Sequence, residues 1–253
     1  MRVKFLGTGT SQGVPVIGCT CAVCTSLDFR NKRLRSSVFI DIENQGLIID
    51  TGPDFRQQML RENITHIHGV LFTHAHRDHT AGLDDIRSFN FLQKMAIPVF
   101  GSEATLSQIE KDFGYIFGAK TYPGLPRIDR HPITDEPFWL NGLSITPLPV
   151  MHLNMPVNGF RIGNFSYVTD TNYIPEATIE KLSGTEVLVL NALQREPHIS
   201  HFNLEEALEM IGRLKPGRAY LTHISHKLGL HGDVEKELPD YVRLAYDGLQ
   251  VTV

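Results

Sequence analysis

Cysteine is scarce in this chain, and its few copies are gathered in one place. The 253 residues include three cysteines, Cys19, Cys21 and Cys24, all within the stretch GCTCAVC at residues 18–24. An odd number of thiols cannot be used up in disulfides, and a reducing compartment favours thiols or metal ligands. We therefore expect this loop to bind a metal together with a fourth ligand from another part of the chain.

Long apolar runs are also absent. No stretch approaches the ~20 apolar residues that a membrane-spanning helix needs. The first residues, MRVKFLGTGT, break at Gly7 and lack the apolar centre of a secretory signal. We expect a cytoplasmic protein without a membrane partner.

The chain has no large excess of positive or negative charge. The chain has 24 Lys and Arg against 28 Asp and Glu, a net charge of −4, and its basic residues are scattered. Proteins that bind duplex DNA more often carry a basic stripe, so DNA is excluded and RNA is not expected. A small anionic substrate in a local pocket is compatible with this balance.

Strand-like and helix-like segments alternate along the chain, which predicts one layered α/β domain over residues 1–253. Strands are expected at 3–7, 37–43, 46–52, 69–74, 97–102, 142–150, 159–170, 186–192 and 218–223. Helices are expected at 53–63, 83–95, 104–113, 175–181 and 204–214, the last capped by Asn203. Residues 114–141 are rich in Pro and Gly, and we interpret them as a long loop or insertion near a site.

The densest chemical motif is THAHRDH at residues 73–79, directly after the apolar strand GVLF. It contains His74, His76, Asp78 and His79. Side chains alternate along an extended chain, so His74 and His76 face one side. The turn that follows directs Asp78 and His79 elsewhere. Two pairs of ligands fit two adjacent metal ions.

Three further polar residues end apolar runs in the same way. His152 follows ITPLPVM, Asp170 follows FSYVT and His223 follows RAYLT. Sites in α/β sheets form at the carboxyl ends of strands, so these residues are expected on one rim with the THAHRDH motif. Seven N and O ligands predict a dinuclear site for Zn²⁺ or Mn²⁺.

These motifs resemble the metallo-β-lactamase superfamily of metallohydrolases. The resemblance runs from LGTGTSQGVP (6–15) through DTGPD (50–54), THAHRDH and TDT (169–171) to THISH (222–226). It implies an αββα four-layer sandwich in which His74, His76 and His152 hold one metal. Asp78, which we also expect to be catalytic, would hold the second with His79 and His223. Asp170 would bridge the metals, and Asp50 would orient a ligand histidine.

THISH also supplies the missing partner of the cysteines. His226 lies three residues beyond His223 and completes a Cys₃His set with Cys19, Cys21 and Cys24. Four protein ligands leave no open position, so we expect one structural Zn²⁺ here. It would tie the N-terminal loop to the segment that carries His223.

The cysteine loop together with THISH resembles the cyclic phosphodiesterase branch associated with phosphonate breakdown. That branch hydrolyses cyclic ribose phosphates and 2′,3′-cyclic nucleotides, so the resemblance implies a small phosphodiester substrate. It also implies attack by a hydroxide shared between two metals, and a homodimer. Alternatives are a tRNA 3′-processing endonuclease, a lactone or thioester hydrolase, and a non-catalytic metal-binding module.

A leaving ribose oxygen needs a proton, and histidine is the commonest general acid. His201 lies before the helix that starts near Leu204, and by resemblance to the family pattern it is the expected donor, with His198 as its rival. His66 and His68 precede their strand and are expected at the opposite sheet edge. His131, within the 114–141 segment, is a further candidate for contact with substrate.

Overall fold

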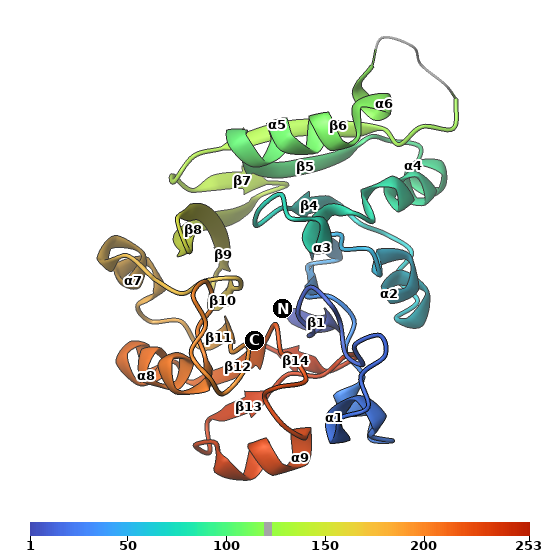
Figure 1. Ribbon diagram of the computed structural model, residues 1–253. Coiled ribbons are helices and arrows are strands. Elements are labelled where there is room, and N and C mark those ends of the chain that lie inside the picture. The colour runs from blue at the N-terminus through green and yellow to red at the C-terminus, as the bar shows by residue number, and fades with distance from the viewer. Residues whose placement is uncertain (119–122) are drawn as a thin grey trace.

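The computed structural model describes residues 1–118 and 123–253. Their strands form two seven-stranded sheets (Figure 1). The first sheet has the order β14 (Gln250–Thr252), β1 (Arg2–Gly7), β2 (Ser37–Ile42), β3 (Gln45–Ile49), β4 (Gly69–Leu71), β5 (Ile97–Ser102) and β6 (Ile128–Ile133). The second has the order β13 (Val242–Leu244), β12 (Arg218–Thr222), β11 (Val187–Asn191), β10 (Phe165–Val168), β9 (Met155–Ile162), β8 (Leu143–His152) and β7 (Phe138–Leu140).

Three apolar layers hold the sheets and helices together. Residues such as Phe5, Ile49 and Phe160 fill the space between the two sheets. Others, including Phe55 and Leu106, lie between the first sheet and its helices. A third layer, with Leu190 and Ile211, packs helices on the second sheet. The predicted αββα sandwich is confirmed.

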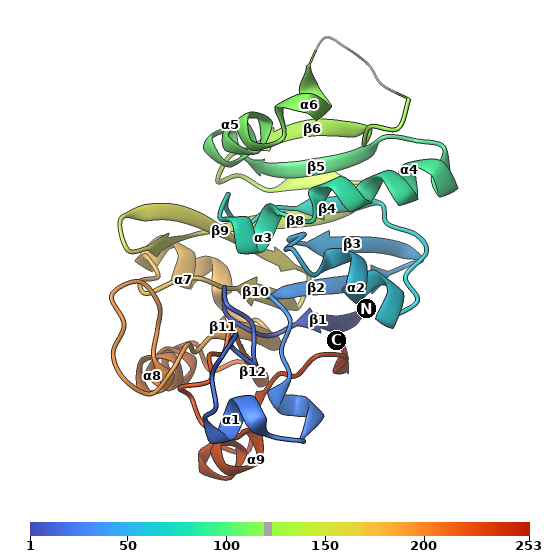
Figure 2. The same cartoon turned by 45° about the vertical axis from the view of Figure 1, so that its right-hand side comes forward.

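Helices cover the outer face of each sheet, as Figures 1 and 2 show. On the first sheet these are α2 (Phe55–Arg61), α4 (Arg87–Gln93) and α5 (Glu103–Asp112), with α3 (Arg77–Thr80) and α6 (Gly114–Phe117) nearby. On the second sheet they are α7 (Glu176–Leu182) and α8 (Leu204–Leu214). The short helices α1 (Ala22–Thr25) and α9 (His231–Val234) lie together at one end, because the segment before α9 packs on the cysteine loop. Three 3₁₀ turns, η1 (Phe29–Asn31), η2 (Leu83–Ile86) and η3 (Glu235–Glu237), complete the described elements.

Local sequence signals account for several element ends. β2 and β3 are joined by Glu43 and Asn44, both at positive φ, which is the conformation of a tight hairpin turn. Helix α8 begins after Asn203, whose side chain accepts from the N–H of Glu206 while the Glu206 carboxylate accepts from the N–H of Asn203. This reciprocal capping box satisfies two otherwise unpaired donors. The predicted cap at Asn203 is confirmed.

The prediction that residues 114–141 form one long loop or insertion is wrong where the structure describes a helix and strands there. Helix α6, strand β6 and strand β7 lie within it, and β6 and β7 each form the last strand of a sheet. Residues 119–122, part of the same segment, lie outside the described residues. The predicted strand over 159–170 is two antiparallel strands, because Gly163 and Asn164 make a turn between β9 and β10.

The direction of the strands places their carboxyl ends together. β3, β4, β5 and β6 run parallel in the first sheet, as β10, β11, β12 and β13 do in the second. Residues that follow β3, β4, β10 and β12 therefore meet along one rim of the sandwich. In the part of the chain that the structure describes, no helix is long and apolar enough to cross a membrane.

Candidate metal centre

Asp170, two residues after the end of β10, lies at the middle of a cluster of histidines and carboxylates. Its carboxylate belongs to three groups of potential ligand atoms. The atoms within each group all lie within 4.8 Å of one another. Together these groups contain His74, His76, Asp78, His79, His152, Asp170, His201 and His223. All seven residues expected on the rim are brought together, and His201 joins them.

The two oxygens of Asp170 face different histidines. Oδ1 lies 2.9 Å from Nδ1 of His223, whereas Oδ2 lies 2.9 Å from Nε2 of His79 and 3.5 Å from Nε2 of His74. Nε2 of His74 lies 2.9 Å from Nδ1 of His76, and Nε2 of His79 lies 3.2 Å from Oδ2 of Asp78. Asp170 therefore lies close to His223 and His79 and, at a longer distance, to His74.

Unusual backbone conformations orient several of these side chains. Asp50, Asp170 and His223 each follow a strand and have φ of 64°, 54° and 56°. Residues other than glycine rarely adopt this left-handed region, and such strain clusters at functional sites. The positive φ makes the backbone turn sharply after each of these strands.

Asp50 contacts the THAHRDH motif on the side of His79 that faces away from Asp170. Its Oδ2 lies 2.7 Å from Nδ1 of His79 and accepts the hydroxyl of Thr73 at 2.8 Å, while Oδ1 accepts the Thr73 N–H at 2.9 Å. Asp50 thus contacts both His79 and the threonine that precedes His74. Because Asp50 takes the Nδ1 side of the imidazole, Nε2 of His79 is directed at Asp170 and Asp78.

The threonines before the rim residues were not singled out from the sequence. Thr73, Thr169 and Thr222 precede His74, Asp170 and His223, and all three threonines are buried. Thr73 binds Asp50, and the Thr169 hydroxyl donates to Oδ1 of Asp170 at 3.0 Å. In each case a threonine at the end of an apolar run is followed by His or Asp, and this repeated pattern in the sequence could have identified the threonines.

The donor set fits divalent cations. Nε2 of His79 is buried and forms no hydrogen bond of acceptable geometry with any described residue. The carboxylates of Asp78 and Asp170 nevertheless lie close to it. Burial opposes charge on His79, but Asp170, Asp78 and Asp50 outweigh it and hold the pKa of His79 well above its ordinary value. Buried carboxylates at this density require nearby positive charge, which a metal ion would supply.

His152 and His201 form the side of the cluster nearest to helix α8. Nδ1 of His152 donates to the Ser200 carbonyl at 2.8 Å, which leaves its Nε2 for another partner. Nε2 of His201 lies 4.0 Å from Oδ2 of Asp170, and its Nδ1 faces the Ser200 hydroxyl at 3.0 Å and Nδ1 of His198 at 3.3 Å. His198 therefore lies behind His201, on the side away from Asp170. Burial, followed by the charge of nearby His223, lowers the pKa of His201 to about 3.

A second cluster joins the N-terminal loop to the segment after β12. Cys19, Cys21, Cys24 and His226 have ligand atoms within 4.8 Å of one another. The Sγ atoms of Cys19 and Cys21 lie 3.3 and 3.4 Å from Nδ1 of His226. Three thiols and one imidazole fit a tetrahedral Zn²⁺ site without an open position.

The remaining histidines are elsewhere. His68 accepts from the N–H of Gly46 at the start of β3, the opposite end of that strand from Asp50. His131 lies on the outer strand β6, stacked on Phe100 with ring centres 4.9 Å apart. It belongs to no metal-ligand cluster among the described residues.

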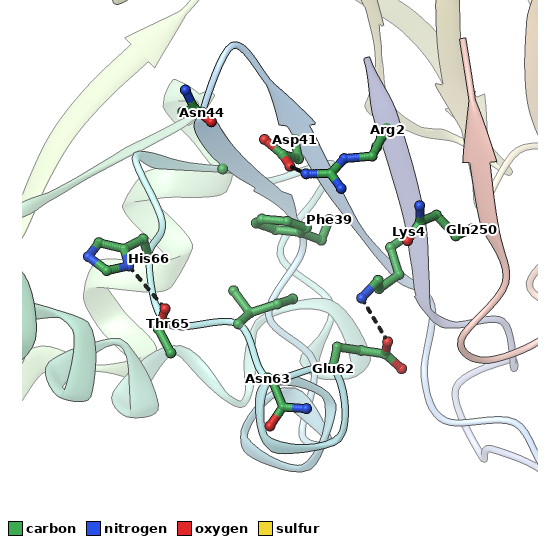
Figure 3. A pocket seen from close by; sticks show the side chains of 12 residues that line it. Arg2, Lys4, Phe39, Asp41, Asn44, Glu62, Asn63, Thr65, His66 and Gln250 are labelled. Carbon is green, nitrogen blue, oxygen red and sulfur yellow. Dashed lines mark hydrogen bonds and ion pairs between the residues drawn. The ribbon is translucent and has the colours of Figure 1, made fainter.

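A groove of about 360 Å³ lies at the starts of β1 and β3 rather than at the rim, and His66 contributes to its wall (Figure 3). Its charged side chains are paired with one another: Arg2 with Asp41, and Lys4 with Glu62, where Nζ lies 3.1 Å from Oε2. Among the described residues that line this groove, none belongs to either ligand cluster.

Known proteins share both the fold and the sequence pattern. A family model described as a β-lactamase superfamily domain matches residues 46–224. The crystal structure of a diphosphatase from the PhnP family superposes with a TM-score of 0.93 at 39% identity, covering 100% of this chain and 97% of that one. The short form of human tRNase Z superposes with a TM-score of 0.72 at 18% identity, covering 100% and 99%, which shows the fold alone.

A Porphyromonas gingivalis protein named octanoyltransferase is 37% identical over the whole of this chain, but the match covers 52% of that protein. The chain thus spans about half the length of this relative, and the activity in the relative's name describes a longer protein. The family model and the PhnP-family structure both cover the rim residues described above. The chain belongs to the β-lactamase superfamily and, within it, to the PhnP branch.

Proposed function

We propose that this protein is a metal-dependent phosphodiesterase that hydrolyses a small cyclic phosphodiester, such as a cyclic ribose phosphate or a 2′,3′-cyclic nucleotide. The observation that carries the proposal is the position of Asp170, between two groups of ligand atoms and 4.0 Å from His201. A bridging carboxylate beside a histidine provides both a metal site and a proton donor. The 39% identity to a PhnP-family diphosphatase supports a phosphorus-containing substrate.

The metal ligands in this proposal form two sets that share Asp170. His74, His76 and His152 would hold one metal ion, and Asp78, His79 and His223 would hold the other, with Zn²⁺ or Mn²⁺ suited to both positions. Divalent ions at such a position act as Lewis acids that neutralise charge on phosphoryl oxygens and lower the pKa of bound water. Asp50 orients His79 through the 2.7 Å contact with Nδ1.

His201 serves as the proton donor to the leaving alkoxide. Its Nε2 points toward Asp170, while Ser200 and His198 contact its Nδ1. In this arrangement His198 orients His201 rather than reaching the leaving group itself. Burial favours neutral His201 in the free protein, and the negative charge of a bound phosphodiester acts in the opposite direction.

The Cys₃His cluster is proposed to bind one structural Zn²⁺. The loop from Thr8 to Thr10 already contacts the segment after β12, because Ile224 exchanges backbone hydrogen bonds with Thr8 and Thr10. A metal at His226 would reinforce this connection, three residues from His223. The cluster would therefore act on the geometry of the rim without taking part in the reaction.

A panel of substrates tests the proposed reaction. Purified protein loaded with Zn²⁺ or Mn²⁺ is given a 2′,3′-cyclic nucleotide, a precursor tRNA with a 3′ extension, and a lactone, at matched enzyme concentrations. The proposal predicts that kcat/KM is highest for the cyclic nucleotide. Preference for the tRNA or the lactone would favour those alternatives, and metal binding without turnover of any ester would favour a non-catalytic module.

A further inference from the structure

Three segments at the rim of the second sheet each carry a residue of the candidate centre. His152 ends β8, Asp170 follows β10, and His201 lies in the irregular segment between β11 and α8. Because these segments are separate in the sequence, their side chains keep a common geometry only if contacts between the segments fix them. Asn172, which lies two residues after Asp170 and outside the ligand clusters, contacts both of the other segments.

Asn172 contacts the chain on both sides of His152. Its backbone N–H donates to the Met151 carbonyl at 3.0 Å, and its Oδ1 accepts from the Leu153 N–H at 2.8 Å. Leu153 has a φ of 56°, a conformation that residues other than glycine rarely adopt, so its surroundings must hold it there. The direction of the His152 side chain therefore depends on Asn172.

The amide nitrogen of Asn172 contacts the segment that carries His201. Nδ2 donates to the Ile199 carbonyl at 3.1 Å, and the next carbonyl, that of Ser200, accepts from Nδ1 of His152 at 2.8 Å. The Ile199 side chain is 74% exposed, so packing does little to fix this part of the chain. These hydrogen bonds join the end of β8 to the segment directly before His201.

Asn172 is anchored by the residue that precedes it. The N–H of Thr171 donates to Oδ1 of Asn191 at 3.0 Å, and the Thr171 carbonyl accepts from Nδ2 of Asn191 at 3.0 Å. Asn191 is the last residue of β11 and is fully buried. The Asn172 amide thus extends from a fixed part of the sheet to two less regular segments, which suits a side chain that orients others.

Resting on the phosphodiesterase function proposed above, we infer that Asn172 is a positioning residue that holds His152 and His201 in one arrangement. Its amide oxygen acts on His152, the proposed metal ligand, through Leu153. Its amide nitrogen acts on His201, the proposed proton donor, through Ile199. Asn172 works through these neighbours rather than on the metal or the substrate, and the two ends of its amide have separable roles.

Two substitutions separate these roles. Asn172→Asp keeps an oxygen that accepts the Leu153 N–H, but it places a second oxygen before the Ile199 carbonyl and loses that hydrogen bond. Asn172→Ala loses both side-chain hydrogen bonds. The matched control is Asn164→Ala, which changes an exposed asparagine at the opposite end of β10 from Asp170.

Zn²⁺ binding reports on His152 and requires no turnover. Calorimetric titration of the metal-free protein with Zn²⁺ should show that Asn172→Ala binds one of its ions about 10–100-fold more weakly, the usual effect of losing a residue that orients a ligand. Asn172→Asp and Asn164→Ala should bind Zn²⁺ as the wild type does. Wild-type affinity in Asn172→Ala would overturn the inference.

Rates at saturating metal report on His201. A 2′,3′-cyclic nucleotide expels an alkoxide, whereas a nitrophenyl phosphodiester needs little protonation. Both Asn172 variants should lose about 10–100-fold in kcat on the cyclic nucleotide and much less on the nitrophenyl ester. Asn164→Ala should keep both rates. A loss in Asn172→Asp that is equal on the two substrates would overturn the inference, because it would not involve the proton donor.

The two measurements also separate this inference from the proposed reaction. If the wild type hydrolyses no cyclic nucleotide, the proposed function fails, and the Zn²⁺ titration alone decides whether Asn172 holds His152. If thermal unfolding shows that Asn172→Ala does not fold, Asn172→Asp decides instead. Retained Zn²⁺ affinity with a loss confined to the cyclic nucleotide would then support the inference, and wild-type rates on both substrates would refute it.

Discussion

At the scale of the residue, Asp170 is the side chain on which the candidate centre depends most. It is buried, and its two oxygens contact His223 and His79 at 2.9 Å each. Burial opposes its ionisation, but the charges of His223 and His79 outweigh burial and hold the pKa of Asp170 well below its ordinary value. A carboxylate that stays ionised in a buried position is suited to bind cations.

His201→Ala should slow substrates with poor leaving groups more than substrates with good ones. The loss on a cyclic nucleotide, which expels an alkoxide, should be about 10²–10⁴-fold in kcat, the usual contribution of a general acid. A nitrophenyl phosphodiester needs little protonation, so its rate should change much less. Steady-state rates on both substrates provide the measurement.

His198→Ala is the matched control for that prediction. Its ring contacts Nδ1 of His201 from the side away from Asp170, so its loss should cost less than the loss of His201. Equal losses of His201→Ala on alkoxide and nitrophenolate substrates would contradict the role of proton donor. A larger alkoxide-specific loss in His198→Ala would exchange the roles of the two histidines.

Residue types at strand ends made the rim predictable, whereas their supporting contacts were not. His74, Asp170 and His223 each follow an apolar run, which is visible in the sequence. The Ser200 carbonyl that orients His152 and the left-handed backbone of His223 depend on tertiary contacts between distant segments. No local pattern encodes such contacts, so they emerge only from the folded chain.

At the scale of the element, helix α8 carries a prediction about stability. Asn203→Ala removes the side chain that accepts from the N–H of Glu206, and loss of such a cap costs about 1 kcal/mol, within a range of about 0.5–2. Urea denaturation should show this decrease in the free energy of unfolding. Asn203→Gly is the control, because glycine at this position costs only a few tenths of a kcal/mol. Unchanged stability in Asn203→Ala would show that the cap is dispensable.

The elements that were predicted well have strong local signals, and those that were missed do not. Helix α8 has its capping box, and the β2–β3 hairpin has Glu43 and Asn44 in its turn. Strand β6 has the sequence IDRHPI, whose charges and proline hide its strand character, and it pairs with β5 at the edge of the sheet. Its conformation is therefore determined by the neighbouring strand more than by its own residues.

At the scale of the whole molecule, the Cys₃His cluster connects residues about 200 positions apart, since His226 contacts Cys19 and Cys21. If a structural Zn²⁺ occupies it, His226→Ala should lose about one zinc per chain while the cluster around Asp170 still loads. The melting temperature should also fall, because structural zinc contributes directly to folding free energy. Metal content by mass spectrometry and thermal unfolding provide the two readouts.

His66→Ala is the control for the zinc measurement, because His66 lies at the groove of Figure 3 and outside both ligand clusters. Its metal content and melting temperature should match those of the wild type. Unchanged metal content in His226→Ala would rule out zinc at the cysteine loop. Loss of all metals would instead show that the two clusters load together.

The most direct test of the central claim is the steady-state rate on a 2′,3′-cyclic nucleotide for metal-loaded wild type and His76→Ala. His76 is exposed, so this change should preserve the fold while removing a proposed ligand. We expect kcat/KM to fall by more than about 100-fold, since even residues that only orient a ligand change metal affinity or activity by about 10–100-fold. His131→Ala, on the outer strand β6, should retain the wild-type rate. Hydrolysis by the wild type that is abolished in His76→Ala supports a phosphodiesterase that works at the Asp170 cluster, and equal rates in the two proteins would contradict it.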